Sequence, residues 1–170
     1  GKWVGNYISP ELEVPEAHKA VLMQVGAYAR DHGHVAKEGI NCGIDYFVSG
    51  DEVIVTEINA RWTGGLFPAE FLRRLAITQP AVAFFDMVPE AQSEAVRTFQ
   101  REHLFPAAGD SFAYVPMGFT PFAMEIEGAE RYFVWQIVVG DFASFVEAKR
   151  QALTEDAFPT AELILQEALS

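Results

Sequence analysis

The sequence GIDYFVSGDEVIVTEINAR, residues 43–61, predicts a β-hairpin. Two runs rich in β-branched and aromatic residues flank residues 50–52, which begin with the turn formers Gly and Asp. Strand formers on both sides of such a turn are typical of two antiparallel strands. The length of the loop then sets which residues of the two strands face each other.

A three-residue loop at residues 50–52 would gather polar side chains on one face of this hairpin. Counting outward from that loop places Asp45 opposite Glu57, and Gly43 opposite Asn59. Side chains alternate between the two faces of a strand, so one face carries Asp45, Glu57, Asn59 and Arg61. The other face is expected to pack on the core, and it carries Ile44, Tyr46, Val48, Ile54, Thr56 and Ile58.

Two neighbouring carboxylates on the polar face indicate a cation site. Asp45 and Glu57 repel each other when both are ionised, unless a cation lies between them. Carboxylate and amide oxygens are the ligands that Mg²⁺ prefers. The sequence therefore predicts a metal site formed by Asp45, Glu57 and Asn59, with a polyphosphate supplying the remaining ligands.

Two other interpretations of the hairpin are open at this point. Asp45 and Glu57 can be solvated residues on an exposed sheet face, with Arg61 in a surface ion pair, which is the commoner situation for an arbitrary hairpin. A two-residue loop at residues 50–51 would also place Thr56, rather than Glu57, opposite Asp45.

The hairpin resembles the metal-binding hairpin of the ATP-grasp superfamily. The resemblance is carried by GIDYFV at 43–48, TEINAR at 56–61 and TGG at 63–65, with VGNY at 4–7 similar to the segment before the preceding family helix. In that family an acidic residue on the first strand and a Glu-x-Asn-x-Arg run about a dozen residues later bind the Mg²⁺ (or Mn²⁺) ions that bridge the phosphates of ATP. Asp45, Glu57 and Asn59 fall on these positions.

The resemblance implies the chemistry of a carboxylate ligase. ATP and Mg²⁺ would phosphorylate a small-molecule or peptide carboxylate to an acylphosphate, and an amine or a thiol would then displace phosphate. Arg61 would be the catalytic residue, because it would stabilise negative charge on the phosphoryl group in transfer. Glycines let backbone donors approach an anion closely, so the nucleotide contacts implied are Asn59, Arg61, Gly64 and Gly65.

The resemblance covers residues 4–75, less than half of the chain. The lysines, glycine-rich lid and adenine pocket of an ATP-grasp enzyme lie mostly before the metal hairpin, and residues 1–42 have no room for them. We therefore expect a fragment that folds alone, binds ATP weakly and is inactive without the missing amino-terminal part. Surface that the missing part would cover is expected to favour a homo-oligomer.

Two alternatives come from other classes of protein. One is a noncatalytic nucleotide-binding or regulatory module with an ATP-grasp-like fold, and the other is a metal-independent structural domain. A module freed from catalysis need not keep four charged or metal-suited groups on one face. This chain has the whole set, which consists of Asp45, Glu57, Asn59 and Arg61. Its presence weighs against both alternatives.

The composition argues against polyanionic partners and membranes. Twelve Lys and Arg against 24 Asp and Glu leave a net charge of −12 at pH 7, which opposes binding to nucleic acid or anionic lipid. The longest apolar runs, such as residues 133–139, fall well short of the roughly 20 residues that cross a bilayer, and no signal-peptide pattern is seen. The single cysteine, Cys42, is interpreted as an unreactive strand residue. These features predict a cytoplasmic protein.

The whole chain predicts an α+β fold, with helices packed on a mostly antiparallel sheet, as the carboxyl-terminal part of an ATP-grasp fold. Residues 1–78 would hold the metal hairpin, and residues 79–170 would form an extension packed on it in one compact domain. Helices are predicted over 15–33, 68–75, 81–88 and 90–103, and after the capping residues Asp141 and Thr160. Strands are predicted within 1–10 and near 112–115, 119–124 and 132–139.

Five other polar or aromatic residues have open roles. His32 and His34 end a helix, where a histidine more often caps carbonyls than binds a metal. Trp62 could stack on a substrate or pack under the turn. Arg73 and Arg74 could reach a substrate carboxylate or be solvated helix charges.

Overall fold

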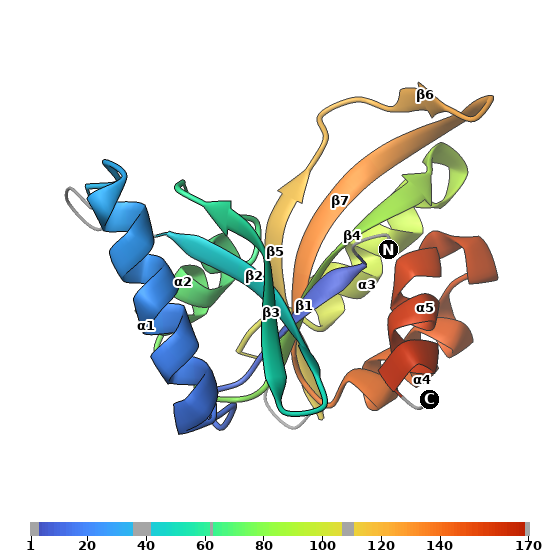
Figure 1. Ribbon diagram of the computed structural model, residues 1–170. Helices are drawn as coiled ribbons and strands as arrows, with labels where there is room; N and C mark the ends of the chain where they lie inside the picture. Colours follow the sequence, from blue (N-terminus) through green and yellow to red (C-terminus); the bar gives the residue numbers. More distant parts are fainter. Residues whose placement is uncertain (1–3, 36–41, 62, 107–110, 169–170) are drawn as a thin grey trace. The chain divides into compact units, whose positions relative to one another are not determined.

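The computed structural model describes residues 4–35, 42–61, 63–106 and 111–168 (Figure 1). The chain divides into two compact units. The hairpin unit is Glu11–Ile77, and the sheet unit is Gly1–Pro10 together with Thr78–Ser170. Every strand-to-strand pairing within the described ranges is antiparallel, which confirms an α+β fold with a mostly antiparallel sheet.

The hairpin unit consists of α1 (Glu16–Asp31), β2 (Gly43–Ser49), β3 (Glu52–Asn59) and α2 (Leu66–Arg74). α1 confirms the helix predicted over residues 15–33. Pro15 precedes its first residue, and Gly33 at φ 97° takes the left-handed conformation that follows a helix end. α1 lies against the hairpin, where the rings of His18 and Tyr46 meet edge to face with centroids 6.1 Å apart.

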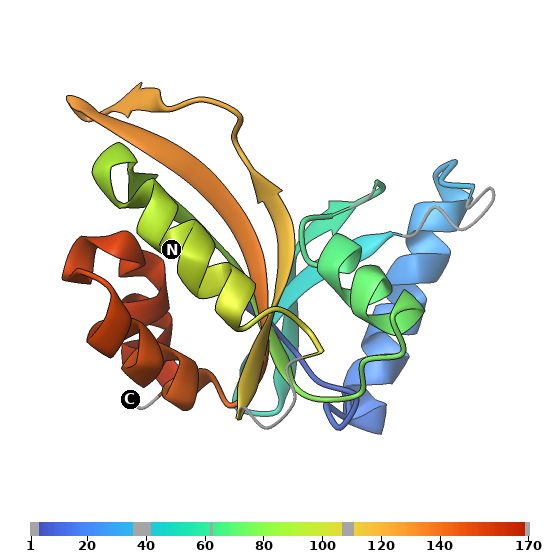
Figure 2. The same cartoon turned by 180° about the vertical axis from the view of Figure 1, so that it is seen from behind.

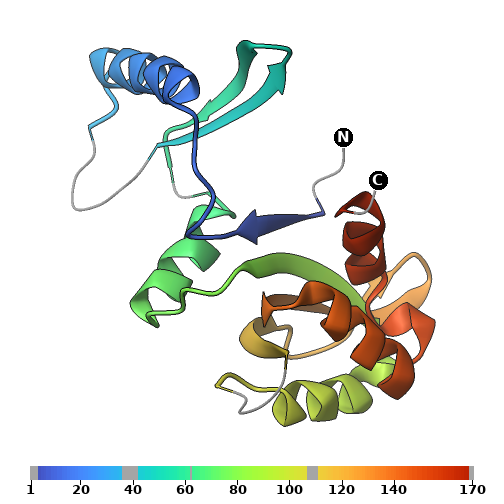
Figure 3. The ribbon, with the colours of Figure 1, turned by 90° about the horizontal axis from the view of Figure 1, so that it is seen from below.

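The sheet unit contains one sheet with the strand order β1-β4-β7-β5, and β6 pairs with β7. Its strands are β1 (Gly5–Ile8), β4 (Ala81–Pro89), β5 (Phe112–Phe119), β6 (Met124–Ile126) and β7 (Ala129–Gly140). One side of this sheet is covered by α3 (Ser93–Glu102), α4 (Phe142–Ala152) and α5 (Pro159–Ala168), with 3-10 turns at Glu90–Gln92 and Glu155–Ala157 (Figure 2). β1 lies beside β4 (Figure 3) and therefore joins this unit, not the hairpin with which its sequence position groups it.

The prediction of a helix over residues 81–88 is wrong, because this segment forms the strand β4. Its sequence AVAFFDMVP is a short apolar run, and such a run fits a buried strand and a buried helix equally well. β4 pairs with β1 on one edge and with β7 on the other, and every one of its residues is buried or partly buried. The strand expected near 119–124 is also displaced, since β5 ends at Phe119 and β6 begins at Met124.

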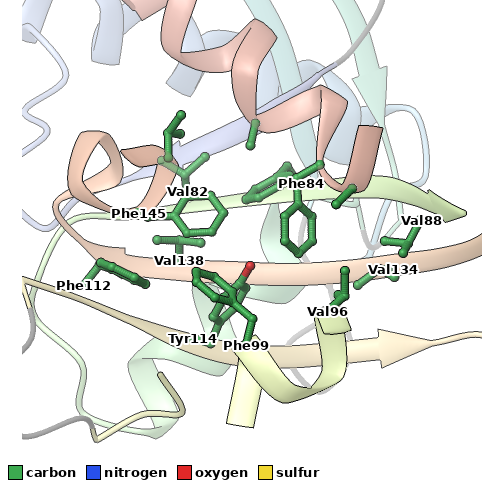
Figure 4. Close-up of a cluster of buried hydrophobic side chains, with 14 residues drawn as sticks. Val82, Phe84, Val88, Val96, Phe99, Phe112, Tyr114, Val134, Val138 and Phe145 are labelled. Atoms are coloured by element: carbon green, nitrogen blue, oxygen red, sulfur yellow. The ribbon is translucent and has the colours of Figure 1, made fainter. Parts of the chain in front are cut away.

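The core of the sheet unit lies between the sheet and its three helices (Figure 4). Alternate residues of β4 and β7 face the helices, as the period of a strand requires. Phe145 of α4 lies at the centre of this core, with its ring centroid 5.4 Å from that of Tyr114 and 6.2 Å from that of Phe84. Each large apolar side chain buried here stabilises the fold by about 1.5–3 kcal/mol.

The starts of α4 and α5 use different caps. Asp141 caps α4 as predicted, because its carboxylate accepts hydrogen bonds from the backbone of Ala143 at 3.0 Å and of Ser144 at 3.4 Å. The prediction that Thr160 caps α5 is wrong, since α5 begins at Pro159. The backbone N–H of Thr160 instead donates to Asp86 Oδ1 at 2.8 Å. A carboxylate on β4 thus binds the first turn of α5.

Among the described residues, no helix combines the length and the apolar character needed to cross a bilayer. The cytoplasmic location stays a prediction.

Candidate metal-binding hairpin

The tip of the hairpin has a two-residue loop and not the predicted three-residue loop. Ser49 pairs with Glu52, which leaves Gly50 and Asp51 as the loop residues. Gly50 has a φ of 60°, and a tight hairpin turn favours glycine at a position with positive φ. The prediction that Ser49 faces Val53 is therefore wrong, because Val53 pairs with Val48.

A β-bulge restores the predicted register at the other end of the hairpin. Tyr46 pairs with Val55, but its neighbour Asp45 pairs with Glu57, so Thr56 is an extra residue on β3. The Thr56 hydroxyl donates a hydrogen bond to the backbone carbonyl of Asp45 at 3.1 Å. The predicted pairings of Asp45 with Glu57 and of Gly43 with Asn59 are both confirmed.

The bulge also changes which residues form the apolar face. Between the bulge and the tip of the hairpin, Val55 pairs with Tyr46 and Val53 pairs with Val48. Directly paired residues lie on the same side of a sheet, so these four residues share one face. Ile54 was predicted on this face, and that part of the prediction is wrong. Ile54 instead pairs with Phe47.

Asp45 and Asn59 are joined by a hydrogen bond between their side chains. Asn59 Nδ2 donates to Asp45 Oδ2 at 3.1 Å. Asn59 is 7% exposed, whereas Asp45 and Glu57 are exposed. The amide is therefore held in place, and both carboxylates can be reached from solvent. The described residues contain no cluster of three or more His, Cys, Asp and Glu side chains that could hold a metal, so a cation here would need ligands from outside the hairpin.

The first turn of α2 lies close to the polar face. A Cβ atom added to Gly43 would lie 2.5 Å from Thr63 Cγ2 and 3.5 Å from Asn59 Cβ, so the absence of a side chain at Gly43 lets Thr63 approach. The Thr63 hydroxyl in turn accepts a hydrogen bond from Leu66 N at 3.4 Å, at the start of α2. The unpaired N–H groups of a helix start attract anions.

The remaining predicted contact residues follow this turn. Gly64 has open space where a Cβ would be, and Gly65 precedes the first residue of α2. α2 begins at Leu66, two residues before the predicted start at Pro68. Arg61 is exposed just after β3, and its backbone N–H donates to Asn59 O at 2.8 Å. Trp62 lies outside the described residues.

Arg73 and Arg74 both bind Glu70 on their own helix. Arg73 Nε lies 2.7 Å from Glu70 Oε2, and Arg74 Nε lies 2.8 Å from Glu70 Oε1. The hydrogen bonds from Arg73 and then from Arg74 lower the pKa of the Glu70 carboxyl to about 2. These contacts favour the interpretation of both arginines as helix surface charges.

The two histidines after α1 have different surroundings. His32 Nδ1 lies 2.9 Å from the carbonyl oxygen of Tyr28, and its ring stacks on the Tyr28 ring at 4.0 Å. This geometry agrees with the cap interpretation of His32. His34 Nε2 is buried and has no hydrogen-bond partner among the described residues. Cys42 immediately precedes β2. Its Sγ atom lies 3.8 Å from the carbonyl oxygen of Gly43, the first residue of that strand.

Sequence reasoning missed one buried carboxylate, Asp86. It is 1% exposed, and Gln136 Nε2 lies 3.4 Å from its Oδ2 atom. Gln100 Nε2 donates to Gln136 Oε1 at 3.2 Å, so the polar contacts run from β4 through β7 to α3. Burial raises the pKa of the Asp86 carboxyl to about 7, against the opposing effect of the hydrogen bond from the Thr160 backbone. A single acid inside the apolar run AVAFFDMVP was the available signal.

The chain matches no protein-family model, no curated protein and no solved structure. The resemblance to the ATP-grasp superfamily therefore depends on its short sequence motifs alone.

Proposed function

We propose that the polar face of the hairpin binds the Mg²⁺ ion of Mg-ATP in an ATP-grasp carboxylate ligase. One observation carries this proposal. The pairing of Asp45 with Glu57 and the 3.1 Å bond from Asn59 to Asp45 gather two carboxylates and an amide at one end of the hairpin. Oxygen donors of these kinds suit Mg²⁺, which usually keeps several waters and takes further ligands from phosphates.

Asp45 and Glu57 supply the negative charge of the site. Both are exposed, and paired residues in an antiparallel sheet have Cβ atoms about 4.5–5.5 Å apart. Two ionised carboxylates at that separation repel each other, and a divalent cation between them removes the repulsion. A cation therefore stabilises the pairing that the bulge creates.

Asn59 acts as the oriented neutral ligand. Its Nδ2 atom donates to Asp45, so the amide oxygen is the atom that it can offer to a cation. The amide is nearly buried, and a ligand already held in one orientation loses little conformational entropy on binding. In the same proposal Arg61 and the N–H groups at Gly64 and Gly65 contact phosphate oxygens.

The chemistry follows from this placement. Asp45, Glu57 and Asn59 would hold Mg²⁺, which would supply positive charge as the γ-phosphoryl group passes from ATP to a substrate carboxylate, with ADP leaving and an acylphosphate formed. An amine or a thiol then attacks the acyl carbon and displaces phosphate. The chain alone supplies one side of the nucleotide site in this proposal, so its own affinity for ATP is weak.

Paramagnetic broadening by Mn²⁺ tests this proposal in solution. Amide resonances near Asp45 and Glu57 are expected to broaden first in an NMR titration, because the ion relaxes nearby nuclei. Glu57→Gln should weaken Mn²⁺ binding at least about tenfold, since it removes one anionic ligand. Glu52→Gln is the matched control, because Glu52 is an exposed carboxylate at the tip of the same hairpin. Equal weakening in both variants would mean that Mn²⁺ responds only to the net negative charge.

A further inference from the structure

We propose that Thr56 is a positioning residue of the hairpin, because its hydroxyl holds the β-bulge that brings Glu57 and Asn59 to the face of Asp45. This role rests on the proposed function, in which those three residues bind a cation. Thr56 is assigned no contact with the cation. It acts by selecting one of the two registers that are available to the second half of β3.

The tip of the hairpin by itself would lead to a different register. Near the tip, Tyr46 pairs with Val55. Continued without a bulge, this ladder would pair Asp45 with Thr56. A shift of one residue turns side chains to the opposite face of a sheet, so Glu57 would then lie on the face of Tyr46. That face lies against α1. This regular register therefore separates the two carboxylates.

The hairpin instead adopts a bulged register, in which Thr56 is an extra residue and Asp45 pairs with Glu57. Ile58 then pairs with Ile44, so two apolar residues stay together while Glu57 remains exposed. Two effects oppose this register, namely the repulsion between the paired carboxylates and the disruption of the ladder at the bulge. Because favourable and unfavourable effects offset each other, one local hydrogen bond has a measurable influence on the register.

The Thr56 hydroxyl supplies such a bond, and the bond belongs to the bulged register. The hydroxyl donates to the backbone carbonyl oxygen of Asp45 at 3.1 Å, across the two strands. Side chains of a regular strand stand roughly perpendicular to the sheet, whereas backbone carbonyls point toward the neighbouring strand. In the regular register the hydroxyl would not point at this carbonyl. The bond therefore favours the bulge.

Only the bulged register gathers the three side chains of the cation site. Glu57 lies directly across from Asp45, and Asn59 Nδ2 donates to Asp45 Oδ2 at 3.1 Å. In the regular register Glu57 and Asn59 would both lie on the face of Tyr46, and Asp45 would be left alone. A cation that binds all three side chains would in turn favour the bulged register, because it has no comparable site in the other one.

Three changes at position 56 separate the hydroxyl from the extra residue. Thr56→Val removes the hydroxyl at nearly constant shape, and Thr56→Ser keeps it. Deletion of Thr56 removes the extra residue, so that a regular ladder pairs Asp45 with Glu57 without a bulge. Ser49→Ala is the control, because Ser49 is an exposed hydroxyl residue at the tip of the same hairpin.

Cross-strand nuclear Overhauser contacts report the register without a metal, and a titration with Mn²⁺ reports the site. One hydrogen bond changes an equilibrium by about two- to twelvefold. Thr56→Val should therefore lower the Mn²⁺ affinity by about three- to tenfold and show new contacts between Ile44 and Glu57. Thr56→Ser, the deletion and Ser49→Ala should keep the contacts between Asp45 and Glu57, with an Mn²⁺ affinity within about twofold of the unmodified protein.

Unchanged contacts and unchanged Mn²⁺ affinity in Thr56→Val would overturn the proposal, and so would an equal loss in Thr56→Ser. A deletion variant that folds but loses the contacts between Asp45 and Glu57 would also overturn it. The contacts keep this test separate from that of the proposed function. An unmodified protein that binds no Mn²⁺ at the hairpin would contradict the proposed function, while the contacts in Thr56→Val would still decide whether Thr56 selects the register.

Discussion

Under the proposed function, Glu57→Gln is expected to abolish ATP turnover by the proposed ligase, while the fold survives. The change removes one negative ligand from the metal at nearly constant shape. A bound metal ion stabilises the developing charge by several kcal/mol, so we expect kcat to fall by about 10²–10³-fold or more. Glu57 is exposed, and such surface changes alter the free energy of unfolding by only about 0.5 kcal/mol.

Steady-state release of ADP with saturating Mg²⁺ is the measurement, and thermal unfolding checks the fold. Glu52→Gln is the control on the same strand, and it should keep full turnover because Glu52 pairs with Ser49 at the far end of the hairpin. Normal turnover in Glu57→Gln would show that Glu57 is not a ligand. Equal loss in both variants would point to an effect of surface charge.

Asp86→Asn is expected to change how the free energy of unfolding depends on pH. The Asp86 pKa is raised from 3.8 to about 7 by burial. The protonated form is therefore favoured in the folded state, and its stabilising effect is fully present below pH 3.8. As the pH rises from 3.8 to 7, the free energy of unfolding therefore falls by about 4 kcal/mol in total. Asparagine carries no charge at any of these pH values, so the Asp86→Asn variant does not show this fall in the free energy of unfolding.

Urea unfolding between pH 3.5 and 8 measures this effect, with the two proteins compared at each pH. The stability of Asp86→Asn relative to the unmodified protein should rise by about 4 kcal/mol between pH 4 and pH 7 and then level off. Glu102→Gln is the control, because Glu102 is exposed on α3 and water solvates its carboxylate in both states. A constant difference between Asp86→Asn and the unmodified protein across this range would contradict the assignment.

The hairpin shows how far sequence reasoning reached. Its two strands and the pairing of Asp45 with Glu57 followed from strand composition and from counting residues. The counting assumed a three-residue loop and no bulge, whereas the hairpin has a two-residue loop and an extra residue at Thr56. The two errors cancel at Asp45, but they do not cancel at Ile54, which was placed on the wrong face. A bulge depends on local backbone geometry that alternation alone does not encode.

The sheet unit shows where local sequence information was insufficient. Residues 81–88 form a central strand because β1 and β7 lie on either side, and these partners come from distant parts of the sequence. Once this segment is placed in a strand, Asp86 faces the helices and binds the first turn of α5. Its role could not be predicted while the segment was interpreted as a helix. Asp141 was predicted correctly because a helix cap is a local interaction.

The metal assignment is tested most directly by anomalous X-ray scattering from crystals of this chain grown with Mn²⁺ and pyrophosphate. Pyrophosphate supplies phosphate oxygens without requiring an adenine pocket, so the hairpin and pyrophosphate together can complete the coordination. We predict one Mn²⁺ peak within about 2.0–2.6 Å of oxygens from Asp45, Glu57 and Asn59. Mn²⁺ bound elsewhere on the chain, with none at the hairpin, would contradict the proposed function.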